Sequence, residues 1–198
     1  MRSSRPVLML PLIPILALVL SLVSAPAQAQ DAMNWVVLLT GDQERPDPVQ
    51  TDAIGTALVS FDPTSFDVDI SINVFGLSRD DLFDISDAGP LHLHIRDAGQ
   101  DNGPFAVTFG TSADWTSGVG GIALIAQGTL ADGFTGEQVM DAMVAGLAYL
   151  NLHTTANMGG EIRGDLAPKP VPEPAVGLLL LVGAVLPVSV RRFRSRSK

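Results

Sequence analysis

Apolar and polar residues alternate without a break over residues 66–74 of this 198-residue chain. The alternation separates two sets of side chains, one apolar and one polar: Phe66, Val68, Ile70, Ile72 and Val74 against Asp67, Asp69, Ser71 and Asn73. Successive side chains of a strand point to opposite faces of its sheet, so a period of two predicts a strand with one buried face and one solvated face. Antiparallel sheets commonly present such faces. We therefore expect a fold that contains a half-buried antiparallel sheet.

Seven other short segments have the composition of strands and are separated by turn residues: 35–39, 55–61, 91–95, 105–109, 122–130, 147–153 and a last one around Ile162. Residues 110–121 are rich in turn formers. One helix is predicted over Gly136 to Ala145, because Thr135 and Gln138 have the spacing of a capping box and an apolar stripe follows. About eight short strands and one brief helix predict an all-β protein, an antiparallel Greek-key β-sandwich or barrel.

The N-terminal end has the pattern of a secretory signal peptide over residues 1–29. Arg2 and Arg5 precede an apolar run over residues 7–23, and Ala27 and Ala29 form a small-x-small cleavage site. A retained transmembrane helix is the alternative, which two prolines early in the run disfavour. We expect export by the Sec machinery and cleavage by signal peptidase, which leaves residues 30–168 as one domain large enough for a core.

Residues 169–198 have the pattern of a tail that enters a membrane. After a proline-containing linker, the motif Val171, Pro172, Glu173 and Pro174 leads into sixteen uncharged residues, and a cluster of arginines with a final lysine follows. Sixteen helical residues cover roughly 24 Å of a ~30 Å hydrocarbon core, so a transient stop suits this transmembrane helix better than a permanent anchor. The basic cluster stays on the cytoplasmic side, which places the rest of the chain outside.

The order of these features resembles the PEP-CTERM sorting tail of Gram-negative bacteria. The resemblance implies recognition and cleavage by exosortase, a membrane protease, after a stage in which the protein is tethered to the inner membrane. An ordinary C-terminal membrane anchor is the alternative. Both interpretations place the body of the protein outside the cytoplasm, at the cell surface or in the extracellular space.

The charge of the chain is concentrated in its central part. Residues 30–168 carry four arginines and twenty carboxylates, a net charge of −16, whereas the whole chain has a net charge of −9. Such a domain repels phosphate backbones, so nucleic-acid binding is excluded, while cationic partners and divalent ions are compatible with it. The charge also serves solubility. The chain has no cysteine, so disulfides, thiolate metal sites and cysteine nucleophiles are ruled out.

Three blocks of the central part resemble the CHRD domain, a module named after the animal protein chordin. They are Leu39-Thr40-Gly41-Asp42-Gln43-Glu44 with Pro46 and Gly55-Thr56-Ala57; His92-Leu93-His94 with Asn102-Gly103-Pro104; and Tyr149-Leu150-Asn151-Leu152-His153-Thr154 with Gly160-Glu161-Ile162-Arg163-Gly164. The likeness spans about residues 34–166. It departs from the family pattern at Arg45 and Asp47, and at Arg96-Asp97, where a glycine is usual. The resemblance implies a β-rich extracellular module.

The three histidines of the chain form the one candidate site. His92 and His94 share a face of one predicted strand, and His153 lies on a polar face of another. If these strands are neighbours, three imidazoles converge with Glu161 close by, a ligand set suited to zinc or copper. The alternative is a polar sheet face whose histidines form ordinary hydrogen bonds.

The sequence offers no catalytic residues. It has no cysteine and no Gly-x-Ser-x-Gly elbow. The leading hypothesis is therefore a non-catalytic exported module, a binding or structural protein of the surface that meets exopolysaccharide or other surface proteins. A metal-dependent redox enzyme and a purely structural envelope protein are the alternatives.

Overall fold

The computed structural model describes residues 32–118 and 120–169. Within these residues it contains ten strands, four short 3-10 helices and one α-helix. The predicted signal peptide and sorting tail lie outside the described residues. Among the described residues, none of the helices has the length and apolar character that a membrane crossing requires.

The ten strands form one antiparallel sheet in the order β6-β7-β3-β2-β1-β10-β9-β4-β5-β8. Their bounds are β1 Met33–Thr40, β2 Ile54–Phe61, β3 Val68–Phe75, β4 Leu91–Ile95, β5 Phe105–Thr108, β6 Thr116–Gly118, β7 Gly121–Gln127, β8 Thr129–Leu130, β9 Ala148–Leu152 and β10 Ile162–Asp165. β1 pairs with β2 along its whole length, whereas its pairing with β10 is a single register position, Thr40 opposite Arg163. The sheet bends at this narrow join.

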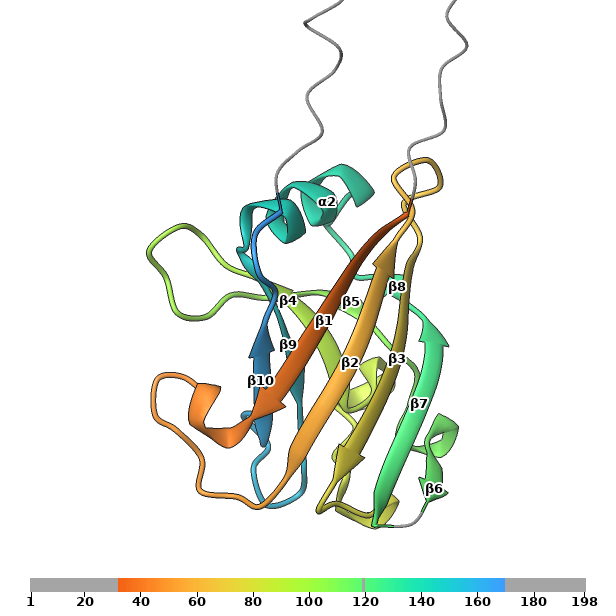
Figure 1. Ribbon diagram of the computed structural model, residues 1–198, viewed down its shortest axis with the longest axis vertical. Coiled ribbons are helices and arrows are strands. Elements are labelled where there is room, and N and C mark those ends of the chain that lie inside the picture. Colours follow the sequence, from red (N-terminus) through yellow and green to blue (C-terminus); the bar gives the residue numbers. More distant parts are fainter. Residues whose placement is uncertain (1–31, 119, 170–198) are drawn as a thin grey trace, which may run out of the picture. The chain divides into compact units, whose positions relative to one another are not determined.

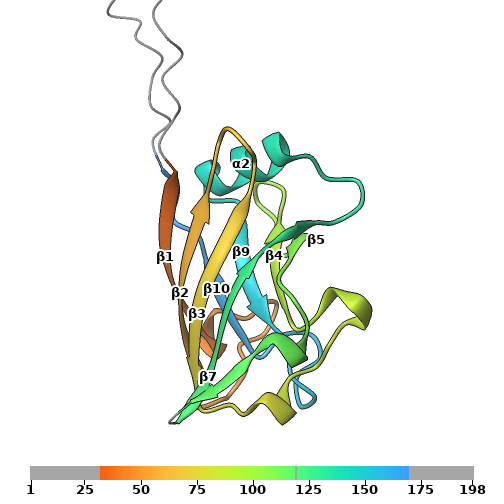
Figure 2. The same ribbon diagram turned by 90° about the vertical axis from the view of Figure 1, so that its right-hand side faces the viewer.

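Because the sheet curls, its two halves lie face to face. Figures 1 and 2 show β1, β2, β3 and β7 as one layer, with β10, β9, β4 and β5 behind it. One apolar core contains residues from both halves, among them Leu39, Val59 and Ile72 from the first and Leu93 and Leu150 from the second. The predicted all-β antiparallel class is confirmed, and hydrogen bonding runs unbroken through all ten strands instead of dividing them into two sheets.

The helix α2 (Gly136–Ala145) has the predicted bounds and cap. The Gln138 N–H donates to the Thr135 hydroxyl, and the Thr135 N–H donates to the Gln138 side chain. Gly146 ends the helix with a φ of 71°, in the left-handed region that glycine adopts most readily. Val139 and Met143 are buried in the core, so α2 covers the end of the curled sheet at the top of Figure 1.

Three strand predictions need correction. Phe66 has a φ of 63° and precedes β3, which begins at Val68; its ring packs edge-on against Phe61 at a centroid distance of 6.2 Å. The predicted strand 122–130 is divided at Gly128 into β7 and β8, whose partners differ: β7 pairs with β3 and β8 with β5. Only glycine fits at the division, because a Cβ there would lie 2.3 Å from Val107 Cγ1. The turn-rich segment contains β6, whose three residues are exposed and carry no apolar periodicity.

The second half of the sheet differs from the first in burial. β1 alternates between buried and exposed residues along most of its length, whereas all five residues of β9 are buried. The apolar side chains of β9 face the core, and its polar side chains are covered from outside by loops. Buried polar side chains normally have hydrogen-bond partners, so the histidines on this covered face require partners of their own.

Candidate metal centre

Strands β4 and β9, which carry the histidines, are direct neighbours. They pair antiparallel with His92 opposite Asn151 and His94 opposite Tyr149. His153 follows β9 immediately, and its N–H donates to the Pro90 carbonyl next to the start of β4. The adjacency on which the predicted site depended is therefore present in the structure.

The three imidazoles converge on one point. Each offers a ring nitrogen, and these three nitrogens lie within 4.8 Å of one another. The ring centroids are 5.8 Å apart for His92 and His94, and 5.1 Å apart for His92 and His153. Ligands about 2.0–2.1 Å from a tetrahedral ion lie roughly 3.4 Å apart. The nitrogens would thus need to draw together by at most about 1.4 Å to share one ion.

Backbone carbonyls determine which nitrogen of two of the rings is available. His94 Nδ1 lies 2.9 Å from the Gly103 carbonyl oxygen, and His153 Nδ1 lies 3.0 Å from that of Met158. A carbonyl oxygen only accepts, so both Nδ1 atoms carry the proton and both Nε2 atoms carry a lone pair. These Nε2 atoms are buried and have no hydrogen-bond partner within the described residues. This is the arrangement in which metal-binding histidines are held.

His92 completes the group without a carbonyl partner of this kind. Its ring is fully buried and stacks on Phe105, with centroids 4.8 Å apart and planes at 24°. The backbone of Ala88 and Gly89 lies near the ring, but among the described residues no atom completes a hydrogen bond with either nitrogen. Two unpaired nitrogens in a buried ring are costly unless a ligand uses one of them.

The cluster is held in the neutral form, which is the metal-binding form. Burial, together with the neighbouring His153 and His94, lowers the pKa of His92 to about 4. Burial likewise lowers the pKa of His94 to about 4, against the opposing hydrogen bond to Gly103. Burial also lowers the pKa of His153. At neutral pH no proton competes with an ion for these nitrogens.

Aromatic and cationic groups support His94 from behind. The Tyr149 ring stacks on the His94 ring, with centroids 4.8 Å apart and planes at 14°. Arg163 lies over the Tyr149 ring, with its guanidinium carbon 3.6 Å from the ring centroid. The guanidinium donates to Asn102 at 2.8 Å and to Asp165 at 2.9 Å. The stack therefore joins β10, β9 and β4 and brings one fixed positive charge to the edge of the cluster.

Glu44 is a buried member of the same polar face that sequence reasoning missed. Only 4% of it is exposed. Burial raises its pKa to about 7, against the attraction of Arg163. Asn151 Nδ2 approaches the Glu44 carboxylate at 3.5 Å, and Glu44 Oε1 has no partner within the described residues. The glutamate of the first CHRD-like block was the signal that could have singled it out.

Glu161, predicted as a fourth ligand, does not join the cluster. The group of side chains able to share an ion contains the three histidines alone. The Glu161 carboxylate accepts hydrogen bonds from Thr154 Oγ1 at 2.7 Å and from Asn157 Nδ2 at 2.5 Å. Although burial raises the pKa of Glu161, hydrogen bonds from Thr51, Asn157 and Thr154 together lower it. Glu161 thus holds the turn that follows His153.

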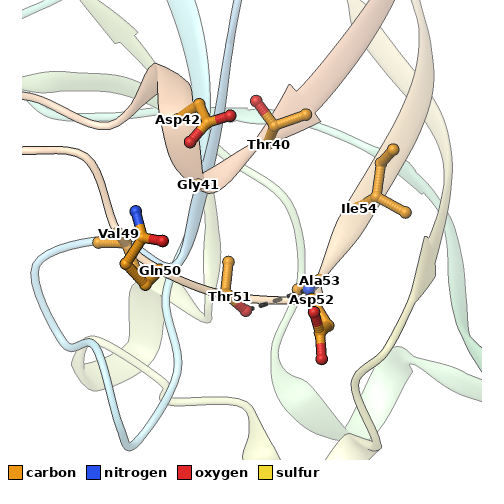
Figure 3. A pocket seen from close by; sticks show the side chains of 9 residues that line it. All are labelled: Thr40, Gly41, Asp42, Val49, Gln50, Thr51, Asp52, Ala53 and Ile54. Carbon is orange, nitrogen blue, oxygen red and sulfur yellow. Dashed lines mark hydrogen bonds between the residues drawn. The ribbon is translucent and has the colours of Figure 1, made fainter.

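A hollow of about 270 Å³ lies beside the short 3-10 helix η1 (Gly41–Gln43), away from the histidines. Thr40, Asp42, Gln50 and Asp52 are among the residues that line it (Figure 3). The Thr51 hydroxyl in its wall accepts a hydrogen bond from the Ala53 N–H. No histidine faces this hollow, so it does not give access to the cluster.

The predicted cleavage residues Ala27 and Ala29 and the motif Val171 to Pro174 lie outside the described residues. Among known protein families, the CHRD domain model matches residues 35–166. No curated protein and no solved structure matches the chain.

Proposed function

The chain belongs to the CHRD domain family, whose model covers residues 35–166, and from this premise we propose that it is an exported, non-catalytic surface module that holds one transition-metal ion between three histidines. The proposal rests chiefly on one observation. His94 and His153 each use Nδ1 for a backbone carbonyl and leave a buried Nε2 without a partner. Neutral imidazoles suit zinc and copper, as they do iron and nickel, whereas magnesium, calcium and manganese prefer oxygen ligands.

The two ends of the chain support export. Residues 1–29 have the composition of a signal peptide for the Sec machinery and signal peptidase, and residues 169–198 have that of a PEP-CTERM tail for exosortase. The proposed product is the domain alone, released at the cell surface or in the extracellular matrix. There the acidic domain meets exopolysaccharide or other surface proteins.

The burial of the cluster favours a binding or structural role over a catalytic one. The unpaired ring nitrogens of all three histidines are inaccessible to solvent. A metal-dependent redox enzyme, the competing function, requires a substrate to reach the ion. Neutral and closely spaced imidazoles are the observation in its favour, but the nitrogens that would hold the ion are buried, which leaves a substrate no open path to it.

Metal analysis of the full chain tests the proposal. The protein is incubated with zinc and with copper, freed of loose ions and measured by elemental mass spectrometry. We expect one ion per chain for the wild type. A His92→Phe/His94→Phe pair should bind none, whereas Tyr149→Phe, a matched control on the same strand face that removes no nitrogen, should keep the ion. A wild type without metal, or a histidine pair that retains full stoichiometry, would contradict the proposal.

Export is tested separately by intact mass spectrometry of the protein isolated from its native host. We expect a chain that begins at Gln30 and lacks the apolar tail. A full-length, uncut chain in the cytosol would overturn this part of the proposal and leave the metal site untouched.

A further inference from the structure

The donor atoms of the cluster bring no negative charge to a bound ion. All three are imidazole nitrogens, and the neutral tautomers follow from the carbonyl contacts of His94 and His153. Two buried carboxyl groups lie near the histidines on the covered polar side of β9, but neither belongs to the three-histidine cluster. Glu44 faces Asn151, and Glu161 accepts hydrogen bonds from Thr154 and Asn157.

The fixed charge that does reach the cluster is positive. Arg163 is 1% exposed and stacks on Tyr149, which in turn stacks on His94. Its counterion Asp165, at the exposed end of β10, pairs with the guanidinium at 2.9 Å and is itself 46% exposed, so solvent screens the aspartate charge more than the buried arginine charge. A positive charge held in a poorly solvated place repels a divalent ion twice as strongly as a monovalent one.

Burial acts in the same direction. The free energy required to move an ion from water into a medium of low dielectric constant rises with the square of its charge. For a divalent ion it is about four times that for a monovalent ion of the same size. The cluster has no carboxylate donor to offset that cost. Solvent also does not reach the unpaired nitrogens, so water is poorly placed to act as the fourth ligand that zinc takes when three side chains bind it.

From this neutral donor set, its burial and the Arg163 charge beside it, we infer that the three-histidine cluster is a site for monovalent copper in trigonal coordination. The inference rests on the proposed function and names the ion for that same site. Imidazole suits zinc, copper, iron and nickel. Copper is the one of these metals with a stable monovalent state, and three neutral nitrogens with no fourth ligand match the low coordination number of that state.

Parallel competition titrations of the full chain test the inference. Under anaerobic conditions with ascorbate, copper is titrated against bicinchoninate, a chromophoric chelator of monovalent copper. Zinc is titrated in a second series against a chromophoric zinc chelator. We expect the monovalent copper dissociation constant to be at least about 100-fold lower than that of zinc. X-ray absorption of the copper-loaded protein should show the edge of the monovalent ion in trigonal geometry.

The outcomes separate the inference from the function on which it rests. Zinc binding that is as tight as that of monovalent copper, or tighter, would overturn the inference and leave the proposed metal site standing. An X-ray absorption edge of divalent copper that persists under ascorbate would have the same consequence. Binding of neither ion would overturn both. The His153→Phe variant should lose copper, because it removes one of the three ring nitrogens, and copper binding by this variant equal to that of the wild type would also contradict the inference.

Discussion

His94 and Tyr149 stack face to face across the β4–β9 pair, with ring centroids 4.8 Å apart and planes at 14°. The Tyr149 hydroxyl group donates to the Gly103 carbonyl at 3.3 Å, and the His94 Nδ1–H donates to the same oxygen at 2.9 Å. One backbone carbonyl oxygen thus accepts hydrogen bonds from both side chains. The stack orients His94 so that its Nε2 points toward the other two histidines.

We expect the Tyr149 ring, and not its hydroxyl group, to position His94. An aromatic pair of this kind contributes about 1 kcal/mol beyond its buried area, so Tyr149→Leu should weaken metal binding by about 5- to 10-fold. Tyr149→Phe keeps the ring and should change affinity by about 2-fold or less. Competition titrations measure both variants, with thermal unfolding to show that each is folded. Equal affinities for the Leu and Phe variants would argue against this role.

Gly160 allows the approach of Asn151 and Glu44. It has a φ of 140°, and a Cβ there would lie 2.5 Å from Asn151 Oδ1 and 2.7 Å from Glu44 Oε1. Gly160→Ala should therefore lower the free energy of unfolding by about 2–3 kcal/mol. Gly159→Ala is the matched control, because nothing lies within 4 Å of its Cβ position. Urea unfolding compares the two, and a similar stability for both would refute the close approach.

Glu44 should make the stability of the protein fall as the pH rises. Its pKa is raised from 4.5 to about 7 in the fold, so the folded state binds more protons than the unfolded chain between these values, and folding weakens across that window. Glu44→Gln cannot ionise and should be more stable than the wild type above pH 7. We expect about 1–2 kcal/mol after allowance for solvent screening. Unfolding free energies at pH 5 and pH 8 measure the effect, and equal pH dependence in both proteins would count against it.

The histidines should have the opposite effect in the metal-free protein. Folding lowers the pKa of His92 and His94 from 6.5 to about 4. The unfolded chain therefore binds more protons than the folded one between pH 4 and 6.5, and the free energy of unfolding should fall as the pH drops through this window. The Glu44→Gln background removes the opposing contribution of Glu44. In that background, a free energy of unfolding that does not change between pH 6.5 and 4.5 would show that the histidines are not held neutral by burial.

Much of the local structure could be predicted because its causes are local. The alternation of β3 and of β4 requires only a period of two, and the cap of α2 requires only Thr135 and Gln138 at the right spacing. The sequence pattern likewise placed His92 and His94 on one face. Phe66 was predicted as part of β3 from the alternation alone. It lies before the strand because its backbone is left-handed and its ring packs against Phe61, and the period of two indicates neither feature.

By itself the sequence determined a cysteine-free, acidic, antiparallel β domain with one capped helix and three histidines on polar strand faces. Only the tertiary structure decided that β4 lies beside β9, that loops bury the histidine face, and that Glu44 belongs to that face while Glu161 turns away from the cluster. The physical reason is that strand neighbours and registers so far apart along the chain follow from how one shared core closes between the two halves of the sheet. That closure is a property of the whole molecule, and no single segment of the sequence carries it.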